Sequence, residues 1–492
     1  MCDLHAKENA TNSERIVGPA GTATDKAWPL FDVAHTRQLE AKQPVSPDGM
    51  RLMHTAGLAL AKFTLAVTPH AKVIWIACGP GNNGGDGLIA ATHLRQWGKE
   101  PIVTIAHDPG KSPPDAQDAW QRAQTAGVQC QQEMPAQFDV GIDALFGIGT
   151  LRPISSTYEN WVERLNDAAA HTIAVDLPSG LEADTGTTAK IHVRADYTLS
   201  LLTLKPGLFT AHGRDAGGEI WFNDLGVNPH FAPQAWLGAP PMLSLRTHAS
   251  HKGSYGDVAI VGGAAGMTGA AWLAGSSALH AGAGRIFVCL LDPQVQSPTP
   301  DMPELMVRTI GDMDWSTKAV VAGCGGGDAI AEVLPKLMRE ARTLVLDADA
   351  LNQLALHPEW TEWLTQRSSG TTAMTPHPLE AARLLGITVS EVQANRLKAA
   401  QLLAERYQCA VALKGSGTVI AFPGELATIN PTGNARLASA GTGDVLAGMV
   451  GAYFAQGLDA SQATRAAVYR HGLAADRWQG PVLHASELCR RI

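Results

Sequence analysis

The chain has 492 residues, of which 45% are hydrophobic and 17% are charged, and its formal net charge is -8 at pH 7. This length is too great for one hydrophobic core and suits two α/β domains. The negative charge and the absence of a dense run of Lys or Arg argue against a nucleic acid or a membrane surface as partner, because both need basic patches.

The seven cysteines are scattered, with no C-x-x-C pair, which predicts neither a disulfide framework nor a thiolate zinc site. We therefore expect reduced thiols and a soluble cytoplasmic enzyme that acts on small molecules. No apolar run approaches the length of a membrane span, and residues 1–27 lack the hydrophobic segment of a secretory signal. We expect these first residues to be loosely ordered.

The first half alternates apolar strands with helical patterns. A helix is predicted over 46–67, and the strand KVIWIAC (72–78) runs through the loop GPGNNGGDG (79–87) into a helix over 88–97. Further strands are predicted at 102–106, 138–142, 172–175 and 197–202. This alternation indicates a parallel, doubly wound sheet that binds ligands at the carboxyl ends of its strands.

Four prolines in the stretch 225–243 (LGVNPHFAPQAWLGAPPML) mark a linker, so we place the domains at 28–225 and 246–492. The second half repeats the α/β alternation. Its strands are predicted at 257–261, 285–290, 319–321, 343–346, 372–375 and 410–413. The pair 418–422 and 426–429, separated by PGE, reads as a hairpin and predicts an antiparallel edge to this sheet.

The loop GPGNNGGDG matches neither the dinucleotide fingerprint nor a Walker loop, because it lacks their spacing and a closing Gly-Lys-Ser/Thr. It either wraps a phosphate or a nicotinamide-sized group, or is a flexible turn with no ligand. Two other predicted strands end at Asp143 and just before Asp176 and Ser179. These oxygen-bearing side chains should converge on the same edge of the sheet, where they could hold a cation.

In this order, GPGNNGGDG, DALFGIG and DLPSG resemble the NAD(P)H-hydrate epimerase domain, also called the YjeF N-terminal domain. The resemblance implies a potassium ion held by Asn83, Asp143 and Ser179, and we expect Asp176 to handle the proton of the epimerisation. The stretch GIGTLRPISS is less glycine-rich than we would expect in this family, and Lys205 lies either near the site or on the surface. The residues implied to contact the hydrated nucleotide are Asn82, Asn83, Gly84, Gly85, Asp86, Gly147, Ile148, Gly149, Thr150, Leu151, Arg152, Pro153 and Asp176.

The stretch 430–448 (NPTGNARLASAGTGDVLAG) reads as a glycine-rich turn that leads into a helix at about Asp444. Gly441 and Gly443 allow the main chain close to a ligand, and the free N–H groups of the helix start would attract phosphate. Asp444 is then either a base aimed past that phosphate at a hydroxyl group, or only an N-cap.

Further polar turns mark the walls of a pocket: GCGGGD (323–328), DADALN (347–352) and TPHPLE (375–380). His377 in the last of these is either a residue that starts a helix or a catalytic group. The turn KGSGT (414–418) supplies a cation and backbone donors suited to the phosphates of a nucleotide.

Together, KGSYGD, GMTGAA, DADALN, TPHPLE, KGSGT and NPTGN with AGTGD resemble the NAD(P)H-hydrate dehydratase domain, a relative of the ribokinase-like kinases. The resemblance implies that Ala270, Gly325, His377 and Asp444 contact the hydrate. It also implies that Lys414, Gly415, Ser416, Gly417, Thr418 and Gly443 hold the adenine nucleotide. Members of this family usually have the sequence GPGLG where this chain has GCGGG. This departure affects the contact with the hydrate that is assigned to Gly325.

The order of the two domains is similar to that of bacterial bifunctional NAD(P)H-hydrate repair enzymes. This implies a Rossmann-like doubly wound sheet followed by a ribokinase-like α/β sandwich. It also implies epimerisation of the R and S hydrates (NADHX and NADPHX) and ADP-dependent dehydration of the S hydrate, with K⁺ in the first site and Mg²⁺ with ADP in the second. We expect a homo-oligomer. The rival functions are a small-molecule kinase and a nucleotide-binding or RNA-associated module, which would need a basic surface.

Overall fold

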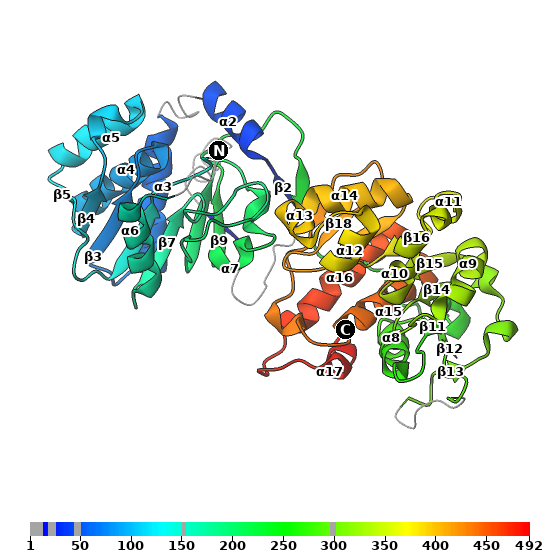
Figure 1. Ribbon diagram of the computed structural model, residues 1–492. Coiled ribbons are helices and arrows are strands. Elements are labelled where there is room, and N and C mark those ends of the chain that lie inside the picture. Colours follow the sequence, from blue (N-terminus) through cyan, green and yellow to red (C-terminus); the bar gives the residue numbers. More distant parts are fainter. Residues whose placement is uncertain (1–12, 18–25, 44–50, 150–153, 296–301) are drawn as a thin grey trace, which may run out of the picture. The chain divides into compact units, whose positions relative to one another are not determined.

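The computed structural model describes residues 13–17, 26–43, 51–149, 154–295 and 302–492 (Figure 1). The chain divides into two compact units. The first comprises Met1–Thr24 and Trp28–Ala235, and the second comprises Asp25–Ala27 and Trp236–Ile492. Each unit is built on its own sheet, which confirms the predicted α/β fold with two domains.

The sheet of the first unit has the order β1-β9-β8-β7-β6-β3-β4-β5, and all its strands are parallel except β1. Strands β4 and β5 lie on one side of β3, and β6 lies on its other side. The switch point of the sheet is therefore between β3 and β6, and doubly wound folds bind ligands at this point. The strands are β1 (Glu14–Val17), β3 (Val73–Cys78), β4 (Glu100–Ile105), β5 (Gln129–Gln131), β6 (Val140–Ala144), β7 (His171–Val175), β8 (Tyr197–Leu201) and β9 (Glu219–Asn223).

Strand β1 corrects one expectation from the sequence. It lies within residues 1–27, which we expected to be loosely ordered, yet it pairs antiparallel with β9 and buries Ile16 completely. A segment of four residues is too short to show a clear alternation, so only its partner strand reveals it.

Helices cover both faces of the first sheet (Figure 1). One apolar cluster joins the sheet to α3, α4 and α5, and another joins it to α6. The helices are α2 (Val33–Lys42), α3 (Leu52–Val67), α4 (Asn82–Gln96), α5 (Pro114–Thr125), α6 (Ser156–Asp167) and α7 (Gly213–Ala216), with short 3₁₀ turns η2 (Pro109–Lys111) and η3 (Pro206–Leu208) and the short strand β2 (Trp28–Leu30).

Helix α4 starts earlier than predicted. We expected a loop over 79–87 and a helix from Leu88, but α4 begins at Asn82. Its first turns pack directly on the sheet because two of their residues have no side chain: a Cβ on Gly84 would collide with the carbonyl oxygen of Gly79, and one on Gly87 would lie 2.7 Å from the Cβ of Ala144. The glycines that suggested a loop therefore allow close helix packing.

The second sheet contains the run β13-β12-β11-β14-β15-β16-β17-β18-β19-β10, with its switch point between β11 and β14. The predicted hairpin β18–β19 is confirmed, but it does not form the edge, because β10 pairs in parallel with β19. Strand β10 lies inside the stretch that we predicted as a linker. The strands are β10 (Ala235–Leu237), β11 (Asp257–Gly262), β12 (Arg285–Leu290), β13 (Met306–Val307), β14 (Ala319–Ala322), β15 (Thr343–Leu346), β16 (Thr372–Met374), β17 (Ala410–Leu413), β18 (Val419–Ala421) and β19 (Thr428–Ile429).

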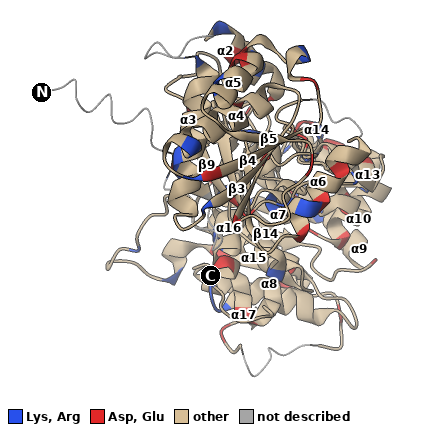
Figure 2. Cartoon of the chain, turned by 90° about the vertical axis from the view of Figure 1, so that its left-hand side faces the viewer, with Lys and Arg blue, Asp and Glu red and all other residues tan. Residues whose placement is uncertain are grey.

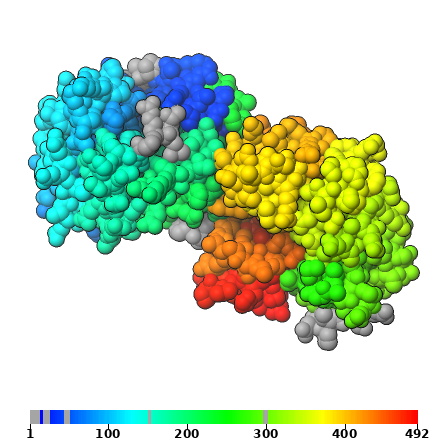
Figure 3. All heavy atoms as spheres, in the orientation of Figure 1, coloured from blue at the N-terminus to red at the C-terminus, as the bar shows by residue number. Residues whose placement is uncertain are grey.

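The second sheet lies between two helical layers, which hide it in the space-filling view (Figure 3). Alternate residues of β11 face opposite layers: Val258 and Ile260 join one apolar cluster, and Ala259 and Val261 join the other. The first layer is α8 (Thr268–His280), α15 (Thr442–Ala455), α16 (Ala460–Asp476) and α17 (Ala485–Cys489). The second is α9 (Ile330–Glu340), α10 (Asp349–Leu356), α11 (Thr361–Thr365), α12 (Pro378–Leu385), α13 (Val389–Ala394) and α14 (Arg396–Tyr407).

No helix among the described residues combines the length and apolar character that crossing a bilayer requires. Figure 2 shows Lys and Arg dispersed among Asp and Glu on the side that faces the viewer, without a concentrated basic region. This distribution agrees with the net charge of -8. It gives no support to the RNA-associated alternative, which needs a positive surface.

Candidate active sites

The first candidate site lies at the switch point of the first sheet. The turn after β3 is joined to the end of β6 by the N–H of Gly79, which donates to the carbonyl oxygen of Ala144 at 2.9 Å. Helix α4 then starts after Gly81, which provides no side-chain cap, and a Cβ on Gly81 would meet no atom within 4 Å. The open N-terminus of a 15-residue helix next to unoccupied space can accept an anionic group.

The structure separates the predicted substrate residues of this region into three groups. Asn82 is exposed and Asp86 half-buried at the start of α4, whereas Asn83, Gly84 and Gly85 are buried. After β6, Gly147 lies near Asn83, since its Cβ would be 3.5 Å from the Asn83 side chain. Ile148 and Gly149 follow Gly147, and Thr150, Leu151, Arg152 and Pro153 lie outside the described residues.

Asp176 directly follows β7 and is held in an unusual conformation. Its backbone φ is +66°, in the left-handed region that costs a non-glycine residue on the order of 1–3 kcal/mol. The carboxylate accepts a hydrogen bond from the N–H of Leu201 at 3.0 Å and forms an ion pair with Lys205. Such local strain is kept when the surroundings fix it, and it is concentrated at functional sites.

Lys205 is fully buried, so the structure excludes the surface position that the sequence left open. Its ammonium group also donates to the carbonyl oxygen of Leu201 at 2.8 Å. A completely buried lysine needs a partner for its charge, and Asp176 provides it. Lys205 and Asp176 therefore form one unit at the carboxyl end of the sheet.

Asp86 lies close enough to the Asp176–Lys205 pair for the charge of Asp176 to affect its pKa. Burial, with further contributions from the charges of Asp176 and Glu40, raises the pKa of Asp86 well above its usual value. Asp86 is therefore a second carboxyl group beside Asp176 at this site.

The three predicted potassium ligands come from the same edge of the sheet. Asp143 and Ser179 are completely buried, and Asn83 is 9% exposed. Asp143 accepts hydrogen bonds from the hydroxyl of Ser179 at 2.6 Å and from its N–H at 2.7 Å. Burial raises the pKa of Asp143 to about 6. Among the described residues the amide nitrogen of Asn83 has no hydrogen-bond partner, although it is buried.

The second candidate site is organised around the start of α15. The N-cap is Gly441, with a φ of +86°, so Asp444 is not the N-cap and its side chain does not cap the helix. The first turn is fixed from the side by His471, whose Nε2 is 2.9 Å from the carbonyl oxygen of Thr442. Asp444 is therefore free for chemistry at the positive end of a 14-residue helix.

The carboxyl group of Asp444 lies in a crowded electrostatic environment. Burial and the neighbouring charge of Asp347 raise its pKa to about 7, although the nearby thiol of Cys324 and the charge of Lys414 oppose the shift. A carboxylate with a pKa near neutrality is suited to general base catalysis, because it is both available and basic at physiological pH.

Lys414 directly follows β17, and its Nζ lies 2.7 Å from the carboxylate of Asp347. Glu380 lies 4.0 Å from the same nitrogen, and the hydroxyl of Thr375 donates to Asp347 at 2.8 Å. These carboxylates outweigh the effect of burial and raise the pKa of Lys414. A Cβ on Gly443 would lie 3.2 Å from the ammonium group, so Lys414 and Gly443, predicted to hold the nucleotide together, are adjacent.

The other predicted nucleotide residues form the turn after β17. Gly415 and Gly417 adopt positive φ angles, and the hydroxyl of Thr418 donates to the carbonyl oxygen of Gly415 at 3.2 Å, with Ser416 between them. Arg396 donates to the carbonyl oxygen of Lys414 at 3.2 Å and fixes the base of this turn.

Two of the predicted hydrate contacts are neighbours. A Cβ on Gly325 would lie 2.9 Å from the Cβ of Ala270 at the start of α8. His377 caps α12, because its Nδ1 accepts hydrogen bonds from the N–H groups of Leu379 and Glu380. Burial and the charge of Lys414 lower the pKa of His377, so its ring is neutral near Lys414. The residue starts a helix, as one interpretation expected, and lies within electrostatic range of the site.

Four residues that the sequence did not assign complete the two sites: Asp347, Glu380 and Cys324 in the second and Lys205 in the first. Asp347 and Glu380 occur in the motifs DADALN and TPHPLE, which were predicted as pocket walls. Cys324, Asp347 and Asp444 place one ligand atom each within 4.8 Å of one another. The ammonium of Lys414 lies 2.7 Å from Asp347, so part of the negative charge of this cluster is already neutralised.

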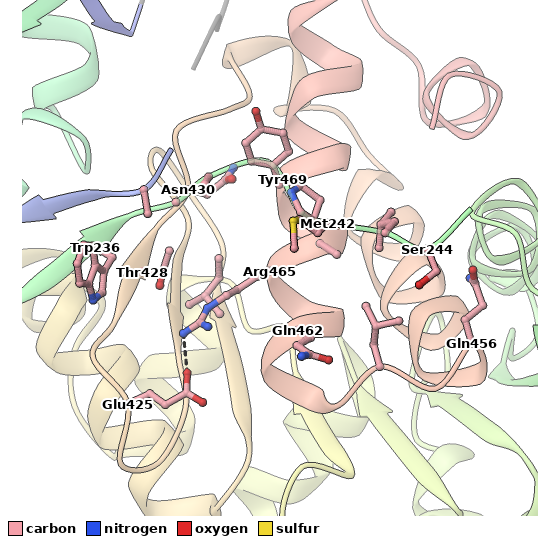
Figure 4. Close-up of a pocket in the computed structure, with 18 of the residues that line it drawn as sticks. Trp236, Met242, Ser244, Glu425, Thr428, Asn430, Gln456, Gln462, Arg465 and Tyr469 are labelled. Carbon is pink, nitrogen blue, oxygen red and sulfur yellow. Dashed lines mark hydrogen bonds and ion pairs between the residues drawn. The ribbon is translucent and has the colours of Figure 1, made fainter. Parts of the chain in front are cut away.

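A separate pocket of about 860 Å³ lies elsewhere in the second unit (Figure 4). Gln456 lines it at the far end of α15, roughly 20 Å from the turn of Asp444 at 1.5 Å per residue. Arg465 is paired there with Glu425 at 2.6 Å, and Asn430 of the NPTGN motif lines the same pocket (Figure 4). This pocket is not the site of Asp444.

Two family models match the chain: one described as YjeF-related protein N-terminus, over residues 49–207, and one described as NAD(P)H-hydrate dehydratase, over residues 258–488. The bifunctional NAD(P)H-hydrate repair enzyme of Escherichia coli K12 is 35% identical over 443 residues, which cover 86% of this chain and 84% of that protein. The chain belongs to the bifunctional NAD(P)H-hydrate repair enzymes. The family member of Coxiella burnetii is 34% identical and covers 87% of this chain and 90% of its own.

Among solved structures, an ADP/ATP-dependent NAD(P)H-hydrate dehydratase from Bacillus subtilis, co-crystallised with ATP and Mg²⁺, is 31% identical. It covers 50% of this chain and 91% of its own, with a TM-score of 0.42. The two family models and the curated relatives confirm the family that the motifs of both halves predicted, and the two sheets agree with the predicted α/β fold class. The contacts of single residues with the hydrate and the nucleotide stay predictions.

Proposed function

We propose that this repair enzyme uses two separate acid–base centres: Asp176 with Lys205 epimerises the R and S hydrates of NADH and NADPH, and Asp444 starts the ADP-dependent dehydration of the S hydrate. The observation that carries this proposal is that each proposed proton carrier has a lysine nearby: Lys205 pairs with Asp176 itself, and Lys414 pairs with Asp347, the carboxylate beside Asp444. Family membership supplies the two activities, and the positions of these residues support the roles that we propose for them.

Dehydration requires a better leaving group than hydroxide. Phosphorylation of the hydroxyl at C6 of the nicotinamide ring provides one, because phosphate then departs with the C6–O bonding electrons and the ring loses a proton to restore the double bond. The hydroxyl oxygen of the hydrate attacks the terminal phosphorus of ADP while Asp444 takes the hydroxyl proton. AMP is the leaving group. The N–H groups at the start of α15 stabilise the charge of the transferring phosphoryl group.

Lys414 and Gly443 hold the nucleotide phosphates beside Asp444, and the turn Gly415–Thr418 adds backbone donors. Mg²⁺ carried by the nucleotide supplies further charge neutralisation when it is bound. The requirement that the C6 hydroxyl reach Asp444 selects one epimer, which explains why the same chain carries an epimerase.

In the first site, Asp176 moves the proton of the C6 hydroxyl. The hydroxyl shares its carbon with the ring nitrogen, so loss of its proton lets the carbon–nitrogen bond open to an aldehyde, and the nitrogen takes up a proton. Reclosure on the other face of the carbonyl, with return of both protons, gives the other epimer. Asp86 and the ammonium of Lys205 are the proton donors that we propose beside Asp176.

Asn83, Asp143 and Ser179 fit a potassium ion. Amide, hydroxyl and carboxylate oxygens are suitable ligands for a hard monovalent cation. The unpartnered amide of Asn83 is oriented by no hydrogen bond from the described residues, which leaves its oxygen available for an ion. A bound cation would also keep the buried Asp143 ionised.

The experiment that tests the function is recovery of the reduced-nicotinamide absorbance from a hydrate mixture, with ADP and with ATP. We expect recovery that depends on nucleotide and releases phosphate and AMP from ADP. Accumulation of a stable phosphorylated hydrate would instead show a small-molecule kinase.

We further propose a cytoplasmic homo-oligomer. The described cysteines are all unpaired, as in a reducing compartment. Sedimentation at micromolar concentration tests the assembly, and a single monomeric species would contradict it.

A further inference from the structure

A buried arginine, Arg396, holds the start of the turn that we assign to the nucleotide. It is the first residue of α14 and is only 1% exposed. Its Nη2 donates to the carbonyl oxygens of Leu413 at 3.1 Å and Lys414 at 3.2 Å. Its Nη1 donates to the side-chain oxygen of Gln393 at 2.7 Å. Because Leu413 is the last residue of β17, the guanidinium group joins the end of this strand to the beginning of the turn 414–418.

The lack of a side chain at Gly415 lets the guanidinium group lie next to the backbone of the turn. A Cβ on Gly415 would be 2.9 Å from both Nη1 and Nη2 of Arg396 and 3.2 Å from its Cζ. The φ angle of Gly415 is +136°, which a residue with a side chain rarely adopts. The sequence suggested Gly415 as a backbone donor for phosphate, and its contact with Arg396 is a second reason for a glycine at this position.

The guanidinium group also brings a fixed positive charge behind the turn. Burial lowers the pKa of Arg396 to about 10, so the group stays charged at neutral pH. A charge that is shielded from water acts more strongly on a nearby phosphate than an exposed charge does. Because Arg396 is buried, it acts on a bound nucleotide through the turn and not by direct contact.

We propose that Arg396 is a positioning residue of the nucleotide site: it holds the turn 414–418 in the conformation that binds the phosphates of ADP and adds positive charge behind them. The inference rests on the proposed role of this turn in holding the nucleotide. Arginine suits the position because its planar guanidinium group presents several N–H donors in fixed directions, whereas the ammonium group of lysine is a point charge. Loss of Arg396 should weaken ADP binding more than it slows the chemical step, because the base Asp444 belongs to a different element, α15.

The chain offers a matched control in Arg367. Its guanidinium group also donates to two backbone carbonyl oxygens, those of Met338 and Ala341, at 2.8 Å each, and burial also lowers its pKa to about 10. Its Nε donates to the hydroxyl of Thr372, the first residue of β16. Strands β16 and β17 are parallel, so Arg367 lies at the end of the sheet opposite to the turn 414–418.

The test compares Arg396→Met, Arg396→Lys and Arg367→Met in three measurements: the Kd of ADP by calorimetry, kcat and KM for dehydration, and urea unfolding. In Arg396→Met we expect the Kd and the KM of ADP to rise about tenfold, the factor that one hydrogen bond to a charged group supplies, and kcat at saturating ADP to stay within about threefold. Arg396→Lys keeps the charge and should give a smaller rise. Arg367→Met should lower the free energy of unfolding as much as Arg396→Met but leave the Kd of ADP within about twofold of wild type.

An unchanged Kd of ADP in Arg396→Met, or an equal rise in Arg367→Met, would overturn the inference. A loss of kcat at saturating ADP that exceeds the rise in Kd would also overturn it, because the defect would then lie in the chemical step. If Arg396→Met does not fold, Arg396→Lys decides: a rise in the Kd of ADP above about twofold supports the inference, and a smaller one contradicts it. A wild-type protein that binds ADP without dehydrating the hydrate would refute the proposed function and leave this inference standing.

Discussion

Both sites contain a lysine that is paired with an aspartate, but they differ in which aspartate the lysine pairs with. In the first, the buried Lys205 pairs directly with the proposed proton carrier Asp176. In the second, Lys414 pairs with Asp347, the neighbour of the proposed base, and Asp444 retains a pKa raised to about 7 by burial and Asp347. Because Lys414 pairs with Asp347 and not with the base itself, the pKa of Asp444 stays near neutrality. The difference suits an epimerase that moves protons in both directions and a dehydratase that must remove one.

The largest effect should come from Asp444→Asn, which removes the base and keeps the shape of the side chain. Loss of a general base lowers a rate by about 10²- to 10⁴-fold. We expect this loss in dehydration, with ADP affinity nearly unchanged, because the charge removed faces the hydroxyl group. Dehydration within a few-fold of wild type would contradict the assignment of the base.

Lys205→Met tests the direct ion pair of the first site. Removing one partner of a buried pair leaves an uncompensated charge and costs about 3–5 kcal/mol of the free energy of unfolding. The matched control is Lys72→Met, since Lys72 pairs with Glu100 at 3.0 Å but its side chain is 70% exposed. Exposed pairs contribute about 0–1 kcal/mol. Equal losses in urea unfolding of the two variants would show that Lys205 and Asp176 are not a coupled unit.

Lys414→Ala should weaken ADP binding by about 1.5–3 kcal/mol through the loss of a charge-assisted contact. The defect should diminish at saturating ADP. Lys336→Ala serves as a control, because Lys336 is exposed on α9 beside Glu340. An ADP titration that is the same for both variants would mean that Lys414 only neutralises Asp347.

The smallest effect is a dependence on pH. Because Asp444 must be ionised to act, dehydration should rise about tenfold per pH unit up to about pH 7 and then level off. The free energy of unfolding of the second domain should change in the opposite direction. The pKa of Asp444 in the folded state lies above the ordinary value of 3.8, so the folded state binds the extra proton, and Asp444 destabilises it increasingly as pH rises from about 4 to 7. Asp444→Asn should remove this contribution, which urea unfolding at pH 5 and pH 8 would show.

The sequence was sufficient to place the carboxylates but not their partners. Asp143 and Asp176 follow predicted strands, so the rule that ligands bind at the carboxyl ends of strands located them, whereas Asp444 was located by the glycine-rich turn that leads into a predicted helix. Lys205 was ambiguous because its burial depends on the tertiary packing of the turn after β8. The start of α4 at Asn82 was missed because glycines that pack a helix closely look like glycines of a loop. Strand β1 was too short to show a periodicity.

The central claim is that the two centres work independently, and complementation between variants tests it most directly. Asp444→Asn alone should recover no absorbance from a mixed-epimer hydrate with ADP, and Asp176→Asn alone should give a fast phase followed by a stall at the spontaneous rate of epimerisation. An equimolar mixture of the two proteins should then restore a single, complete phase. A mixture that still stalls after the first epimer is consumed would contradict the account.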